Sequence, residues 1–65
     1  MTWSTKGHLT LINEVTKAGG IDNFCKKYSL SQKVITDYIR RLRVPNYMTR
    51  IALAALVGLP LNSFD

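Results

Sequence analysis

Apolar side chains recur at helical spacing in four stretches of the chain, and small or turn-forming residues separate these stretches. The first stretch covers residues 8–18. Its positions Leu9, Ile12 and Val15 share one face of a helix, which is predicted to end at the glycine pair 19–20. Residues 1–7 lack this periodicity and are predicted to form a loose N-terminal arm.

Two shorter helices are predicted next, on either side of a tight break at residues 29–31. The helix over residues 22–28 buries Phe24 and Cys25. After the break, the hydroxyl of Ser31 is placed to cap a third helix that runs to about residue 42. One face of this third helix is apolar and consists of Ile35, Tyr38, Ile39 and Leu42.

The last part of the chain predicts one more helix. Residues 44–46 contain Pro45 and form a corner, because proline cannot continue the preceding helix and suits the start of the next. An alanine-rich helix follows over residues 46–57 and stops at Gly58, and residues 59–65 form a turn. No segment alternates with period two, so we expect an all-α fold: one compact domain of four or five short helices over residues 8–65.

Basic residues concentrate in one third of the chain. The formal net charge is +5, and residues 1–25 and 44–65 each sum to zero. The whole excess lies in residues 26–43, which contain six Lys and Arg residues and one acidic residue, Asp37, for a net charge of six minus one. Such a one-signed patch on a small domain indicates a polyanionic partner, unless it only solubilises a helix surface.

The chain offers little for catalysis or for a metal site. Cys25 is a lone cysteine that cannot form an internal disulfide, and no Cys/His cluster has metal-ligand spacing. Neither Cys25 nor His8 has the neighbours that would make a nucleophile and its base. No apolar run reaches the ~18 residues of a membrane span, and no secretory signal is recognisable. We therefore expect a cytoplasmic protein that is not an enzyme and uses no cofactor, metal or small-molecule substrate.

Residues 21–41 meet the requirements of a helix-turn-helix unit together. The first helix needs a small side chain where the second crosses it, and Cys25 supplies one. The turn needs an apolar plug, which is Leu30. The second helix needs a cap and inward-facing apolar residues, and Ser31 and Ile35 meet these needs.

The segment 19–61 resembles the small Cro-like and YdaS-like prophage regulators. The shared features are the glycine pair, the helix-turn-helix, a basic exit with Val44-Pro45, and an alanine-rich helix that ends in the Gly58-Leu59 turn. The turn position that glycine most often fills in these proteins holds Ser29 here. The resemblance implies a lambda-repressor-like helix-turn-helix domain. It would act as a Cro-type repressor in a bacterial host cell, binding double-stranded DNA at an operator that overlaps a promoter and excluding RNA polymerase.

The resemblance also assigns roles on the helix that begins at Ser31, which would enter the major groove. The implied base contacts are Ser31, Gln32, Lys33, Thr36, Asp37 and Arg40. Glutamine can pair with adenine through two hydrogen bonds, and lysine can donate to guanine. Two roles are open for Asp37: it accepts a hydrogen bond from a cytosine amino group, or it pairs within the helix with Lys33 or Arg41.

Phosphate contacts are expected from the flanks of that helix. The candidates are Asn23, Lys26, Lys27, Arg41, Arg43 and Asn46. Each neutralised phosphate adds about −0.9 to the slope of log K against log salt, so DNA binding should depend steeply on salt.

So small a domain makes few base contacts, and we expect two copies on a pseudo-palindromic operator. The candidate dimer surface consists of Trp3, Leu59, Leu61 and Phe64. An alternative function of a different class stays open. A protein of the same fold could be a protein-binding module, such as an antitoxin, an anti-repressor or an inhibitor of a host protein. Such a module would use the apolar C-terminal surface and would need the basic face little.

Overall fold

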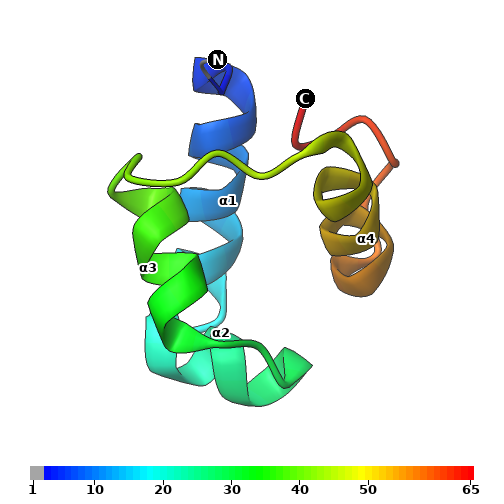
Figure 1. Cartoon of the computed structure of the whole chain (residues 1–65). Helices are drawn as coiled ribbons and strands as arrows, with labels where there is room; N and C mark the ends of the chain where they lie inside the picture. The colour runs from blue at the N-terminus through cyan, green and yellow to red at the C-terminus, as the bar shows by residue number, and fades with distance from the viewer. Residues whose placement is uncertain (1–2) are drawn as a thin grey trace.

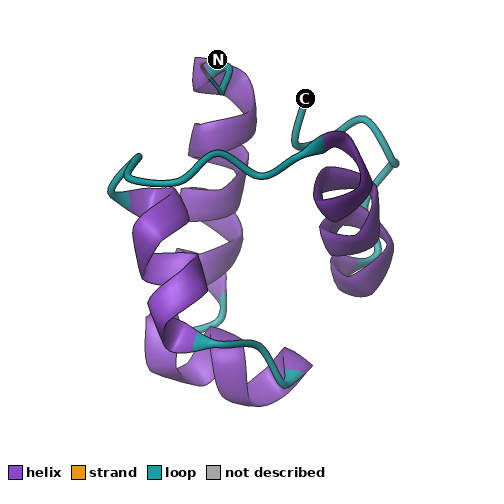
Figure 2. Cartoon of the chain, viewed as in Figure 1, coloured by secondary structure: helices purple, strands orange, loops and turns teal. Residues whose placement is uncertain are grey.

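Helices make up most of residues 3–65, the part of the chain that the computed structural model describes (Figures 1 and 2). This part has four helices and no strands, so the prediction of an all-α fold is confirmed. The helices are α1 (Thr5–Lys17), α2 (Ile21–Tyr28), α3 (Gln32–Ile39) and α4 (Tyr47–Val57). None of them is long and apolar enough to cross a bilayer.

Helix α1 begins three residues earlier than its periodicity predicts. The Ser4 hydroxyl accepts a hydrogen bond from the backbone N–H of Gly7 at 3.0 Å and caps the helix. Trp3, just ahead of the cap, is buried. The prediction of a loose arm over residues 1–7 is therefore wrong for residues 3–7, while residues 1–2 lie outside the described part.

The reason for this order lies at the other end of the chain. The indole Nε1 of Trp3 donates to the backbone carbonyl of Phe64 at 2.7 Å, and the Ser4 hydroxyl donates to the carbonyl of Asp65. Gly7 lies directly beneath this contact and is itself buried. The N-terminal segment is thus held by residues 61 positions away, which no local periodicity can reveal.

A tight turn joins α2 to α3. Ser29 has a left-handed backbone (φ 56°), and the N–H of Leu30 donates to the carbonyl of Cys25. The Ser31 hydroxyl then accepts from the N–H of Val34, so the predicted cap at Ser31 is confirmed. The three helices α1, α2 and α3 pack on one another around a core that includes Leu11, Val15, Phe24, Cys25, Ile35 and Tyr38.

Helix α3 ends at Ile39 and does not reach residue 42 as predicted. Arg41 has a left-handed backbone (φ 61°), and the N–H of Leu42 turns back to the carbonyl of Asp37 at 2.9 Å. Leu42 therefore leaves the apolar stripe and is 69% exposed, which corrects its assignment to the core face. Sequence could not place this stop, because arginine at such a position is uncommon.

Two contacts from the N-terminal segment hold this end of α3. The Arg41 guanidinium donates to the carbonyl of Trp3 at 2.7 Å. The Nε2 of His8 lies 2.6 Å from the carbonyl of Ile39, which can only accept, so this nitrogen carries the proton. The Trp3 ring also packs edge-on against the rings of His8 and Tyr38. These contacts orient α3 relative to α1.

Helix α4 follows a loop that crosses from α3 to the other side of the molecule (Figure 1). The side chain of Asn46 caps it by accepting from the N–H of Thr49 at 2.9 Å, and it ends at Gly58. Residues 59–65 then turn back as predicted and bury Phe64. Arg50 fixes this return, since its Nε lies 3.0 Å from the Asp65 carboxylate.

Candidate nucleic-acid interface

The first turn of α3 presents polar side chains to solvent. Gln32 and Lys33 are exposed, and Ser31 before them is exposed as well. The opposite face of the helix is anchored in the core by Ile35 and Tyr38. The N-terminal end of α3 therefore presents its polar side chains to solvent.

The amide of Gln32 is oriented by a residue of α2. Its Nε2 donates to Oδ1 of Asp22 at 2.6 Å, and the second oxygen of Asp22 lies 3.5 Å from the ammonium of Lys26. A carboxylate only accepts hydrogen bonds, so the NH₂ group of Gln32 must face Asp22. One N–H and the amide oxygen of Gln32 are left for another partner. Sequence analysis did not single out Asp22, because this contact crosses a turn between positions ten residues apart.

Asp37 forms ion pairs within the molecule. Its carboxylate lies 3.6 Å from Lys33 Nζ and 3.8 Å from Arg43 Nε, and its side chain is only 18% exposed. Of the two roles open for Asp37, the structure has the intrahelical pair with Lys33. The second cation is Arg43, whereas Arg41 turns to Trp3. Asp37 thus holds two cations beside α3 and offers little surface of its own.

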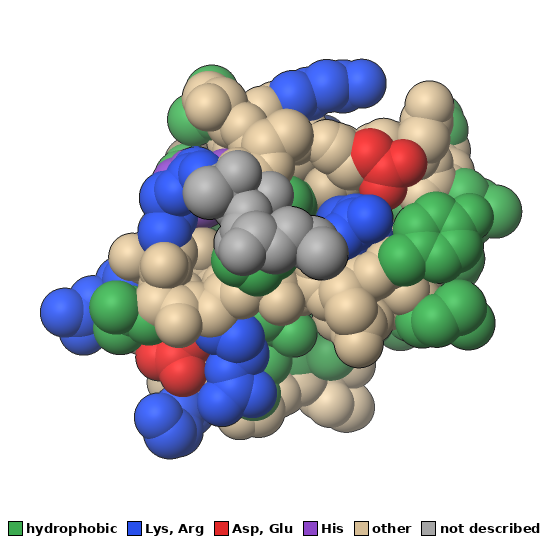
Figure 3. Space-filling model, turned by 45° about the horizontal axis from the view of Figure 1, so that its top comes forward, with side chains coloured by type: hydrophobic (Ala, Val, Ile, Leu, Met, Phe, Trp, Pro, Cys, Tyr) green, Lys and Arg blue, Asp and Glu red, His purple; other side chains and the backbone are tan. Residues whose placement is uncertain are grey.

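The remaining base-contact candidates lie further along α3. Thr36 is half-buried, and Arg40 is exposed at the C-terminal end of the helix. Figure 3 shows Lys and Arg side chains gathered on the side of the molecule where α3 and the following loop lie. Arg40, Arg41 and Arg43 belong to this segment and are all exposed. The structure thus brings most of the predicted cations to one side.

The other phosphate-contact candidates are dispersed. Lys26 and Gln32 both contact the carboxylate of Asp22, which places Lys26 near the N-terminal end of α3. Asn23 is exposed in the first turn of α2 and donates to the carbonyl of Gly19. Asn46 caps α4, across the loop from α3, which separates it from the predicted contact surface. Its side-chain oxygen is engaged in this cap, next to the corner at Pro45.

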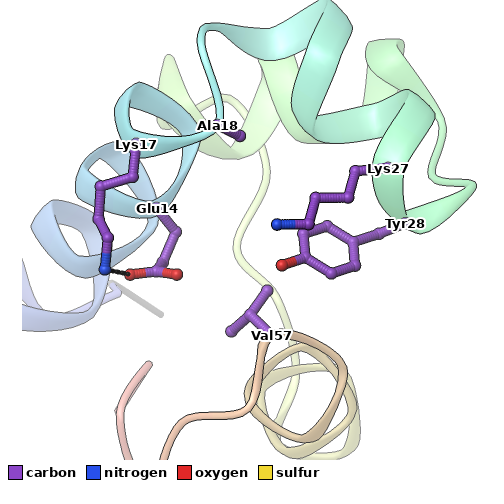
Figure 4. A pocket seen from close by; sticks show the side chains of 6 residues that line it. All are labelled: Glu14, Lys17, Ala18, Lys27, Tyr28 and Val57. Carbon is purple, nitrogen blue, oxygen red and sulfur yellow. Dashed lines mark hydrogen bonds and ion pairs between the residues drawn. The ribbon is translucent and has the colours of Figure 1, made fainter.

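Lys27 is also separated from the end of α3. It points into a hollow of about 290 Å³ between α1, α2 and α4, where its ammonium lies 5.4 Å from the centre of the Tyr28 ring (Figure 4). The residues that line this hollow are Glu14, Lys17, Ala18, Lys27, Tyr28 and Val57. Lys17 pairs with Glu14 at 3.4 Å across part of the opening. The hollow thus carries charges of both signs and is no continuation of the basic side.

The lone cysteine is a packing residue in the structure. Cys25 is buried beneath the turn, and its burial raises the pKa of the thiol, with the nearby carboxylate of Asp22 adding to the rise. A thiol held in its protonated form is a poor nucleophile. Among residues 3–65, no group of three or more His, Cys, Asp and Glu side chains is placed to hold a metal ion.

The predicted dimer surface is largely wrong. Trp3 and Phe64 are buried against each other's segments, and Leu59 is half-buried. Only Leu61 of the four is exposed. Trp3, Leu59 and Phe64 are thus used to close the fold. The exposed large apolar side chains on α4 are Tyr47, Met48 and Leu56.

Comparison with protein-family models, curated proteins and solved structures gives no match for this chain. Its function must therefore be inferred from the residues themselves.

Proposed function

We propose that this chain is a sequence-specific regulator that binds double-stranded DNA. The α2–turn–α3 segment would act as a helix-turn-helix of the lambda-repressor-like kind, in the manner of a Cro-type repressor. The observation that carries the proposal is the exposure of Gln32 and Lys33 on the first turn of α3, while the other face of that helix is locked in the core.

The chemistry of this turn suits base recognition. With one N–H donated to Asp22, Gln32 retains an N–H and an oxygen, the pair that adenine N7 and N6 require. Lys33 can exchange its ion pair with Asp37 for the acceptors of guanine, because its own side chain is 81% exposed and Asp37 keeps Arg43 as a second cation. The first turn of α3 would therefore distinguish purines in the major groove.

The surrounding cations suit phosphate binding. Arg40 and Arg43 flank the C-terminal end of α3, and Lys26 flanks its N-terminal end through Asp22. Cations at the two ends of an exposed helix can contact the phosphates on either side of a groove. This arrangement predicts that affinity falls steeply as salt rises.

The test begins by selecting bound sequences from a random duplex pool and measuring affinity for the selected site and for random duplex. Gln32→Ala should reduce the ratio of the two affinities by roughly 5- to 150-fold, since a bidentate base contact contributes about 1–3 kcal/mol of discrimination. Arg43→Ala should weaken both affinities equally and flatten the salt slope by about 0.9. Lys17→Ala, at the hollow, is the matched control and should change neither.

Two results would contradict the proposal. One is that the wild-type chain binds no duplex at low salt. The other is that Gln32→Ala weakens selected and random duplexes by the same factor, which would remove Gln32 from base recognition.

A second candidate is a protein-binding module of the same fold, and the exposed apolar side chains of α4 favour it. Such a module would bind its partner independently of the basic side. Absence of duplex binding at low salt, together with retention of a protein partner, would favour this candidate over DNA binding.

A further inference from the structure

One face of α4 is exposed although it is entirely apolar. Leu53 and Ala54 face the core, and the opposite side carries Met48, Ala52, Ala55 and Leu56, which we call the outer face of α4. At 3.6 residues per turn these four positions fall within an arc of about 100°. Met48 is 70% exposed and Leu56 is 44% exposed. An amphipathic surface helix would place polar residues here.

The outer face also carries no charge. The one charged residue of α4 is Arg50, and it points away, with its Nε on the Asp65 carboxylate and its Nη1 donating to the carbonyl of Pro45. In a chain of net charge +5, this face is a neutral area. A second copy of the chain would bring no like charges into direct contact here, so only the longer-range repulsion between the two net charges opposes pairing. The face also lacks the flanking lysines and arginines of a membrane-surface helix.

The spacing on the outer face is symmetric. Met48 and Leu56 each lie four residues from Ala52, so a large, a small and a large side chain follow one another along one ridge. If two such helices cross antiparallel at Ala52, Met48 of each copy meets Leu56 of the other. The small central residue lets the backbones approach, and ridges of i±4 spacing interlock at a crossing angle of about −50°. A pattern that is its own complement fits a two-fold pair.

We propose that the outer face of α4 binds the same face of a second copy of this chain, antiparallel, about a two-fold axis at Ala52. The α3 end and its cations lie on the opposite side of the molecule from α4 (Figure 3), so both copies keep them exposed. This pairing does not depend on DNA binding and goes beyond the proposed function.

The pairing is weak and has its own dependence on salt. A stable interface covers roughly 800 Å² on each partner, more than four side chains on an 11-residue helix supply. The dimer therefore dissociates on dilution. Salt screens the repulsion between two copies of charge +5 and strengthens apolar contacts, so added salt promotes pairing. DNA binding responds to salt in the opposite direction, which keeps the two proposals separate.

Sedimentation equilibrium of the full chain, from micromolar to millimolar concentration at low and high salt, tests the pairing. We expect the apparent mass to rise toward that of a dimer with concentration and with salt. Met48→Glu and Leu56→Lys should each weaken pairing by roughly tenfold or more, because each buries a charge against an apolar side chain. Leu9→Glu, at a 55% exposed leucine of α1, is the matched control and should pair like the wild type.

The double variant M48E/L56K decides the geometry. Its two substituted positions lie about 12 Å apart along one helix and cannot pair within a chain. Across the antiparallel dimer they form two opposite-charge pairs, so association should recover relative to both single variants, most strongly at low salt. A wild-type chain that stays monomeric at millimolar concentration and high salt would overturn the proposal. So would a double variant no better than either single variant, or a control weakened as much as they are.

Discussion

The contact between the two ends of the chain makes Gly7→Ala a strong test of the fold. A Cβ at this position would clash with the Phe64 carbonyl oxygen and lie 2.5 Å from Trp3 Nε1 and 2.7 Å from the Phe64 carbonyl carbon. Overpacking of this kind costs about 1–3 kcal/mol. Loss of the buried Trp3–Phe64 hydrogen bond adds about 1–3 kcal/mol. Alanine returns about 1 kcal/mol through its higher helix propensity.

The sum is a loss of about 1–5 kcal/mol, centred near 3 kcal/mol. A domain of this length has about 3–10 kcal/mol in total, so the variant should lose a large share of its stability. Helix propensity alone predicts the opposite sign, because an alanine in a helix is ordinarily more stable than a glycine. The sign of the change therefore separates the two explanations.

Urea unfolding followed by circular dichroism measures the effect. Asn13→Ala, at an exposed position of the same helix, controls for propensity and should be neutral or stabilising. In a Trp3→Phe background, which removes the indole N–H, Gly7→Ala should cost less than in the wild type. The reasoning is refuted if Gly7→Ala unfolds at the same or higher urea concentration than the wild type.

Four further substitutions have expected outcomes. Ser29→Gly should raise the free energy of unfolding by about 0.5–1 kcal/mol, because glycine adopts the left-handed backbone of this position without strain. Ser31→Ala should lower it by about 1 kcal/mol, because it removes the cap of α3. Urea midpoints of the two variants that move in the same direction would contradict these expectations. Asp22→Ala should raise affinity for random duplex about 2- to 5-fold, because it removes a negative charge. It should also lower the ratio of affinities for selected and random duplex, because Gln32 loses the contact that orients its amide. An unchanged ratio in a binding assay would count against positioning by Asp22. The pKa of the Cys25 thiol is raised in the fold, so the unfolded chain releases this proton first and the free energy of unfolding should fall as pH rises through the usual value of 9.0. Cys25→Ala should flatten this fall when unfolding is measured against pH. An equal fall in the variant and the wild type would refute the expectation.

Local patterns predicted most of the helices. The spacing in α1, the serine cap of α3 and the glycine after α4 are signals within a few residues of the features they specify. Ser29 departs from the glycine that the resemblance leads one to expect in this turn, and it nevertheless has a positive φ. That the α2–α3 pair binds DNA as a helix-turn-helix stays a prediction.

Features that depend on distant contacts were not predictable. The burial of Trp3 depends on Phe64, and the early end of α3 depends on Arg41 reaching the carbonyl of Trp3. No periodicity in a short segment contains that information. The Asp22–Gln32 contact likewise depends on the geometry of the turn. The sequence could therefore locate the candidate site, but it could not predict the contacts between the residues of that site.

Trp3 is the one tryptophan of the chain, and its ring lies in the contact that joins the first described residues to the last. Contacts between such distant positions carry a large loop-closure entropy and are expected to form late in folding. The emission spectrum of the indole should consequently complete its shift to the native wavelength only when the two ends meet. The molecule thus contains an intrinsic fluorophore whose signal separates helix formation, seen by circular dichroism, from the final closure of the polypeptide.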